Sequence, residues 1–372
     1  MHRLKLDRER QTDRWTNFDR RVSTVPNSPE RGFELALYSV VAEDKEACRA
    51  AVRWGISHTS EIRQRAVIAN WCQAGESDAE RSQLLATPSK MPAQSSIETA
   101  RDALFTQVVL GKASRESARQ QWSQLLPAIQ QDPRSCLPNL YALFEFVDVV
   151  DKNFRLDLRQ DDAHLFANLP SLFLMAMSPR STETPDWRTR AAGLMMVTVD
   201  PNLQSSSFVQ GWAMEDPKMA TDGPGVAYEF LWANPYLPGL GYHNMNLWYY
   251  DEPSGLLIAR DSWDTDSCWV SLYHGRVERT QCSARVFDER TTFGNLVLLP
   301  FKGDCVTVTQ QRTGSTILTG LVPGSTIEWT DQDSQHTAQA DRSGLLLVSA
   351  TISGQVCRAD RVAKKESSSG KH

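Results

Sequence analysis

Three adjacent side chains in the middle of the sequence are the best suited to chemistry. Tyr242, His243 and Asn244 follow one another within the aromatic stretch 223–275. A Tyr or His can take up a proton, and an amide or imidazole can neutralise a nearby carboxylate. Neighbouring side chains of a strand point to opposite faces, so the three could converge only in a loop. The alternative is a packed Tyr beside a hydrogen-bonded structural His.

Two residues further along the chain extend this candidate site. His274 is expected to end a strand, where it is either a second candidate base or the His of a surface turn. Arg260 is expected within a strand, beside Asp261. Its guanidinium could bind a sugar carboxylate through two hydrogen bonds, or it could form a structural ion pair. The candidate catalytic residues are Tyr242, His243 and His274.

Aromatic residues concentrate around these candidates. The stretch 223–275 holds four of the eleven tryptophans of the chain. Aromatic faces bind sugar rings, but they also fill the interfaces between domains. If the stretch binds a sugar, the candidate substrate-binding residues are Trp232, Asn234, Tyr236, Asn244, Arg260 and Trp263.

Metal and cofactor motifs are weak or missing in the sequence. Asp261, Asp264 and Asp266 could offer oxygen ligands to Ca²⁺. They lack the glycine and the distal glutamate of an EF-hand loop, so an acidic turn is the better interpretation. The sequence contains no GxSxG, HExxH or Walker motif. We therefore expect no metal and no cofactor.

The overall composition narrows the class of protein. The chain has 372 residues and a formal net charge of −5, without a dominant basic patch, which disfavours nucleic acid as a partner. No apolar run reaches the roughly 18–20 residues that a membrane span needs. The charged N-terminal residues lack the apolar core of a signal peptide. Four cysteines of the second half could form one or two disulfides or remain buried thiols: Cys268, Cys282, Cys305 and Cys357.

The apolar periodicity changes near Pro238, from a helical spacing to the alternation of strands. Residues 1–30 are predicted to be a polar surface segment, and helices are predicted at 138–150 and 185–198. Glu145 and Asp148 are expected on a solvated flank of the first of these helices. Gly239 and Gly241 are expected to adopt positive φ where the chain turns. The predicted fold is α+β, with an antiparallel helical domain over 1–240, an antiparallel β-sandwich over 241–360 and a disordered tail over 361–372.

The segment LLIARDSWDTDSCWVSL, residues 256–272, resembles a strand–turn–strand of the heparinase II/III-like polysaccharide lyases. In that family an (α/α) toroid precedes a β-sandwich. The resemblance implies an uronate-containing polysaccharide as partner, its cleavage by β-elimination in the cleft between the domains, and a periplasmic or secreted location. In the segment 273–300, after His274, the sequence lacks the second His and the acidic–glycine pair typical of the family. The alternative is therefore a non-catalytic relative that binds glycans or serves as an exported scaffold.

Overall fold

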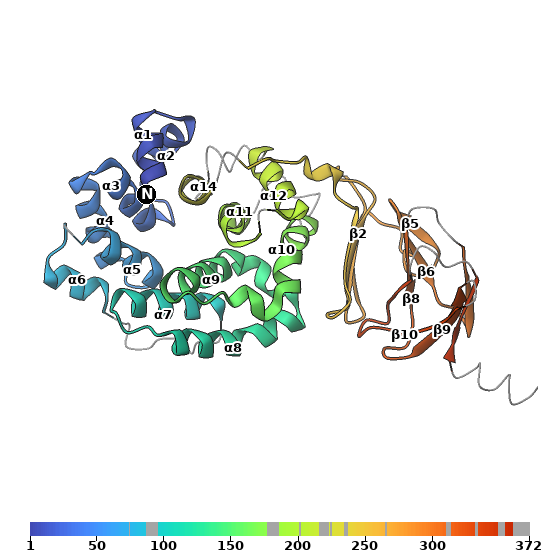
Figure 1. Ribbon diagram of the computed structural model, residues 1–372. Coiled ribbons are helices and arrows are strands. Elements are labelled where there is room, and N and C mark those ends of the chain that lie inside the picture. Colours follow the sequence, from blue (N-terminus) through green and yellow to red (C-terminus); the bar gives the residue numbers. More distant parts are fainter. Residues whose placement is uncertain are drawn as a thin grey trace, which may run out of the picture. The chain divides into compact units, whose positions relative to one another are not determined.

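A computed structural model of the chain describes residues 1–73, 75–86, 96–176, 186–200, 202–215, 223, 225–233, 237–264, 266–309, 314–331, 334–348 and 354–359. The chain divides into two compact units. One, the helical unit, comprises Met1–Pro170 and Glu183–Tyr242, and the other, the β unit, comprises Ser171–Thr182 and His243–His372. Helices precede strands along the chain (Figure 1), so the predicted α+β class is confirmed. The predicted tail 361–372 lies outside the described residues.

The first half of the chain is a succession of helices that begin at polar caps. Ser96 and Ser114, for example, each accept a hydrogen bond from the backbone three residues later, which starts a helix. The predicted helices 138–150 and 185–198 correspond to α9 and α11. The α-helices are α1 (His2–Glu9), α2 (Asp13–Thr24), α3 (Arg31–Ala42), α4 (Lys45–Ser57), α5 (Ile62–Trp71), α6 (Asp78–Leu84), α7 (Ile97–Val109), α8 (Arg115–Gln131), α9 (Leu140–Phe154), α10 (Ala163–Met175), α11 (Asp186–Thr198), α12 (Gln204–Glu215) and α14 (Gly225–Trp232). Short 3-10 helices are η1 (Pro133–Asn139), η2 (Leu158–Asp162) and η3 (Tyr242–Asn244).

Alternate helices of the helical unit pack side by side in a closed sequence. Helix α3 packs on α5, α5 on α7, α7 on α9, α9 on α11 and α11 on α14. Helix α14 packs on α2, which returns to α3. Among the described residues of the unit, these helices therefore enclose a common centre, while α4, α6 and α12 pack on them from outside (Figure 1).

The N-terminal residues belong to this packing, so the prediction of a polar surface segment over 1–30 is wrong. Helix α2 buries Trp15, Phe18 and Val22, and Phe18 stacks on Phe230 of α14 with 4.8 Å between ring centroids. The three side chains recur at helical spacing within a charged sequence, so they form one apolar face of α2.

The described residues of the β unit form three four-stranded sheets, with the orders β1-β2-β3-β4, β11-β8-β6-β5 and β10-β9-β12-β7. Strands β6 and β8 pair in parallel, whereas the other pairings between described strands are antiparallel. The strands are β1 (Trp248–Asp251), β2 (Leu256–Arg260), β3 (Trp269–Tyr273), β4 (Arg276–Thr280), β5 (Thr291–Phe293), β6 (Leu296–Pro300), β7 (Cys305–Val308), β8 (Ser315–Thr319), β9 (Thr326–Asp331), β10 (Ser334–Gln339), β11 (Leu346–Val348) and β12 (Gly354–Arg358).

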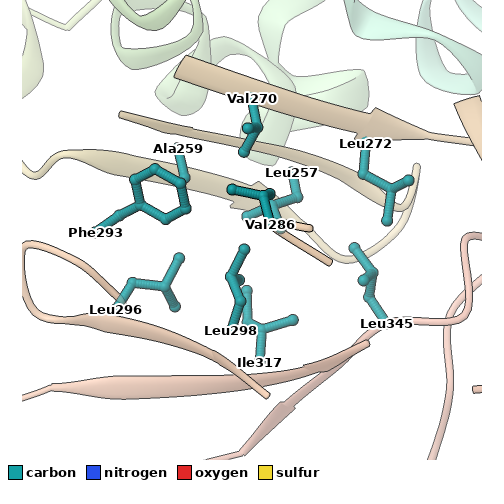
Figure 2. Close-up of a cluster of buried hydrophobic side chains, with 10 residues drawn as sticks. All are labelled: Leu257, Ala259, Val270, Leu272, Val286, Phe293, Leu296, Leu298, Ile317 and Leu345. Atoms are coloured by element: carbon teal, nitrogen blue, oxygen red, sulfur yellow. The ribbon is translucent and has the colours of Figure 1, made fainter. Parts of the chain in front are cut away.

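The sheet that contains β6 and β8 contributes to an apolar core on each of its faces. Ile317 of β8 joins a cluster with residues of β2 and β3, such as Leu257 and Val270 (Figure 2). The next residue, Leu318, joins a second cluster with residues of β9 and β12, such as Ile327. Successive side chains of a strand point to opposite faces, so one strand supplies both cores. This is why β6, with the sequence LVLLP, is continuously apolar.

Two disulfides join segments of the β unit. Cys305 and Cys357 face each other on the paired strands β7 and β12, with 4.1 Å between their Cα atoms. Cys268 and Cys282 flank the β3–β4 hairpin and are also bonded. Of the two alternatives for these four cysteines, the structure therefore has disulfides. The cysteines of the helical unit, Cys48, Cys72 and Cys136, are buried free thiols.

Gly239 is required for a reason other than the one predicted. Neither Gly239 nor Gly241 is among the residues with positive φ, so the prediction of positive φ at these two positions is wrong. A Cβ at Gly239 would instead lie 3.0 Å from the Cα of Gly211 on α12. A Cβ at Gly211 would overlap the carbonyl oxygen of Leu240. Gly211 and Gly239 let the segment after α14 lie directly against α12.

None of the described helices is long and apolar enough to cross a lipid bilayer.

Candidate functional site

A polar cavity of about 690 Å³ lies within the helical unit, at the N-terminal ends of α3, α5, α7, α9 and α11. We call it the polar cavity. The N-terminal end of a helix carries unpaired N–H groups and a partial positive charge. Because five such ends meet at this cavity, their partial charges add to those of the side chains that line it. The side chains that line it come mainly from the first two turns of these helices and from the residues just before them: Glu30, Glu61, Arg63, Glu98, Arg101, Asp102, Tyr141 and Arg190, with Trp54 and His58 from the C-terminal end of α4.

A buried ionic network stands behind the wall of the polar cavity. The Nε and Nη2 atoms of Arg63 donate to the carboxylate of Glu145, with an Nε–Oε1 distance of 2.8 Å. Arg101 donates to the other oxygen of Glu145 at 2.9 Å. Glu145 is 4% exposed, so its prediction as a residue of a solvated flank is wrong. Two guanidinium groups compensate for the cost of removing this carboxylate from water.

The network continues to the opening of the cavity through Glu30. Its two oxygens accept hydrogen bonds from Arg63 at 2.6 Å and from Arg190 at 2.9 Å. The guanidinium of Arg190 lies 3.9 Å from the ring centroid of Tyr141, and the Tyr141 hydroxyl donates to Glu98 at 2.8 Å. Each polar group at this wall is thus held in a fixed orientation by its neighbour.

Burial and charge together set the protonation states of the network. Burial raises the pKa of the Tyr141 phenol, although Arg190 and Arg101 oppose this increase. Burial also raises the pKa of Asp102, against the effect of Arg101. For Arg63, burial alone would lower the pKa, but the Glu145 carboxylate raises it well above the usual value. Tyr141 is therefore a hydrogen-bond donor at neutral pH, and Arg63 stays charged.

An aromatic pair forms one side of the polar cavity. The imidazole of His58 stacks on the indole of Trp54, with ring centroids 4.2 Å apart and planes 10° apart. His58 is exposed, and its Nδ1 atom contacts the carbonyl oxygen of Trp54 at 2.8 Å. Flat faces beside fixed carboxylates and guanidinium groups are the combination with which proteins hold a polar ring.

A second cavity, of about 300 Å³, lies on the other side of the Arg63–Glu145 pair, because both residues line it. It is bounded by the C-terminal ends of α5, α7, α9 and α14, and we call it the aromatic cavity. Its lining includes Phe33, Trp71, Phe105, Asp148, Lys152 and Trp232. Trp232, a predicted sugar-binding residue, is therefore a wall of this cavity.

The predicted trio Tyr242, His243 and Asn244 forms the short 3-10 helix η3. In such a helix three residues complete a turn, so consecutive side chains point about 120° apart. His243 and Asn244 are exposed and Tyr242 is half-buried. The three residues are therefore not in a strand, which would have excluded a common site. Their side chains nevertheless point away from one another in this turn. Two other predicted binding residues, Asn234 and Tyr236, lie outside the described residues.

The predicted residues of the β unit fall at two ends of one sheet. Arg260 is buried, and its guanidinium lies 4.2 Å from the ring centroid of Trp263. Arg260 pairs with Trp269 at the start of β3, whereas His274 follows the end of β3. Five residues of a strand span roughly 17 Å. The sheet therefore brings Arg260 to Trp263 but does not bring His274 to either of them.

His274 is the first residue of a tight turn between β3 and β4. It has φ 47° and the following Gly275 has φ 71°, and its backbone N–H donates to the Ser343 hydroxyl at 2.9 Å. Two consecutive positive φ angles are typical of a two-residue hairpin turn. Of the two alternatives, the surface turn describes the position of His274. Within the described ranges, no group of His, Cys, Asp and Glu residues is arranged to hold a metal ion.

Sequence reasoning missed the residues of the polar cavity. The available signal was the presence of charged residues at apolar positions of helices, as in LFEFVDVV, where Glu145 is flanked by buried residues. Such a residue needs a partner from another helix, and Arg63 is 82 positions away.

No family model matches the sequence, and no curated protein matches it significantly.

Proposed function

We propose that the protein is carbohydrate-active and binds a saccharide in the polar cavity of the helical unit. The observation that carries the proposal is the wall of this cavity, where the Trp54–His58 pair and Tyr141 lie among carboxylates and guanidinium groups. Sugars present apolar ring faces and hydroxyls that both donate and accept hydrogen bonds. Such a wall matches both features, and its network fixes the polar groups before a ligand arrives.

The arrangement of helices supports the same proposal. The closed sequence of helix contacts from α3 to α14 and α2 is the packing expected of an (α/α) toroid, the helical domain of the heparinase II/III-like lyases. The two sheets around the core of Figure 2 would then correspond to the β-sandwich of that family. We assign the substrate class from this resemblance as an uronate-containing saccharide. The five helix N-terminal ends and Arg190 favour its carboxylate.

The polar cavity supports binding better than elimination. β-Elimination needs a group that removes the proton next to the uronate carboxylate. Burial raises the pKa of Tyr141, which keeps this phenol protonated at neutral pH and suits it to donate a hydrogen bond to a sugar. The conclusion is therefore a glycan-binding protein. The disulfides of the β unit support an exported one, because disulfides persist mainly in oxidising compartments.

Catalysis by β-elimination is the second candidate, favoured by the solvent exposure of His243 and Asn244 on η3. An exposed imidazole next to an amide provides a base and a carboxylate-binding group, although they do not converge in the free protein. If this candidate is correct, His243→Ala lowers turnover by about 10²–10⁴-fold.

Two measurements on the same samples distinguish glycan binding from cleavage by β-elimination. Uronate-containing and neutral oligosaccharides are titrated by calorimetry, and the absorbance of an unsaturated uronate product is followed in parallel. We expect binding of an uronate oligosaccharide without product, and an affinity about tenfold lower for His58→Ala, which removes one stacked ring. His164→Ala, an exposed His of α10, is the matched control and should bind as the wild type does. Absence of binding to every saccharide would contradict the proposal, and formation of product would favour the second candidate.

A further inference from the structure

The aromatic cavity offers a different chemistry from the polar cavity, because the C-terminal ends of α5, α7, α9 and α14 surround it. The last carbonyl groups of a helix carry a partial negative charge, which favours a cation. Two carboxylates, those of Glu145 and Asp148, also line the space. Glu145 is already bonded to Arg63 and Arg101, whereas the Asp148 side chain is 11% exposed and lies nearer the opening.

Aromatic side chains form much of the remaining wall. Trp71, Phe105 and Trp232 line the cavity, and the ring of Phe33 lies 5.7 Å from that of Trp71. The face of an aromatic ring is negative, so several rings around one space hold an organic cation, above all one that carries methyl groups. The same rings do not distinguish strongly between neutral apolar groups.

An ammonium group of the chain itself already occupies the opening. The Nζ atom of Lys152 lies 4.6 Å from the ring centroid of Trp232 and donates to Asp148 at 2.7 Å. The Lys152 side chain is 56% exposed and has a flexible stem, so it can leave the cavity without disturbing the packing. Once it has left, Asp148 and the ring of Trp232 would be available to another cation.

We propose that the aromatic cavity is a binding site for a small organic ammonium ion, and that Lys152 competes with this ligand for Asp148 and Trp232. The volume of about 300 Å³ suits a trimethylammonium group with a short polar arm. The site is separated from the polar cavity by the Arg63–Glu145 pair, and it does not depend on the function proposed for that cavity.

The test compares choline with its neutral carbon isostere, 3,3-dimethylbutan-1-ol, by titration of tryptophan fluorescence and by calorimetry. The two probes have nearly the same shape and differ in charge. We expect choline to bind at least about tenfold more tightly than the isostere, because the aromatic faces and Asp148 attract the positive charge that only choline carries. Equal affinities for the two probes would overturn the proposal.

Variants locate the site and test the competition. Lys152→Met removes the competing ammonium and should tighten choline binding, while Asp148→Asn should weaken it about tenfold and Trp232→Leu should weaken it further. Lys152 is exposed, so its replacement should leave the fold intact. Circular dichroism is used to check the fold of each variant. Failure of choline to bind to both the wild type and Lys152→Met would also overturn the proposal.

Discussion

The two units fill their interiors in opposite ways. At the centre of the helical unit, buried charges alternate in sign, from Glu30 through Arg63 to Glu145 and Arg101. The cores of the β unit are apolar, and two disulfides link its segments. A buried ionic network adds less stability than an apolar core of the same size, but it holds polar groups in place. The comparison indicates that the helical unit is built around a polar site and the β unit around its own stability.

The largest effect is expected when the ionic centre of the helical unit is broken. Glu145→Gln leaves the Arg63 and Arg101 guanidinium groups buried without their shared carboxylate, which should lower the free energy of unfolding by about 3–5 kcal/mol. Asp148→Asn, one turn along the same helix, removes a partner of exposed Lys152 and should cost less than about 1 kcal/mol. Denaturant titration measures both. Similar losses for the two variants would mean that the centre is not specially sensitive.

The β unit should depend on its disulfides in the same measure. The double variant Cys305→Ala/Cys357→Ala opens a loop with a sequence separation of 52 residues, and we expect a loss of about 4 kcal/mol. Thiol titration of the unfolded wild type is the direct check. Three reactive thiols are expected before reduction and seven after it, since the helical unit holds the three free cysteines. Seven thiols before reduction would contradict the pairing.

One glycine of each unit allows the same comparison with smaller expected losses of stability. Gly211→Ala should cost about 2–3 kcal/mol, because the new Cβ would overlap the Leu240 backbone within the helical unit. Gly275→Ala in the β3–β4 turn meets no neighbouring atom but must adopt φ 71°, and should cost about 1 kcal/mol. Thermal unfolding of the two variants measures this order. A larger loss for Gly275→Ala would show that conformation, and not close packing, limits substitution.

A further effect, confined to alkaline pH, is expected at Tyr38. Burial, followed by the hydrogen bond to Asp19, raises the pKa of Tyr38 in α3 to about 12. The folded state thus holds this proton more tightly than the unfolded chain, in which the pKa is about 10. The resulting stabilisation is complete below pH 10 and is lost as the pH rises from about 10 to 12. Tyr38→Phe should flatten the pH dependence of the unfolding free energy in that range, and an unchanged slope would exclude Tyr38 as its source.

The sequence supported the fold better than the site. Periodicity identified α9 and the change to strands near Pro238, because local spacing reports which face of an element is buried. It could not show that β6 pairs with β8 in parallel, or that Glu145 meets Arg63, since both contacts join distant parts of the chain. The aromatic stretch drew attention to Tyr242 and His274, whereas the polar cavity is assembled from polar and charged residues at the ends of several helices. No local motif marks such a site.

The most direct test of the account is hydrogen–deuterium exchange with and without a saturating uronate oligosaccharide. Binding in the polar cavity should slow exchange at the helix starts around it, in segments 26–30, 58–64 and 98–102. The β3–β4 turn at His274 and the strands of the β unit should exchange as before. Protection confined to the β unit, with no change in those three segments, would contradict the assignment of the saccharide site to the helical unit.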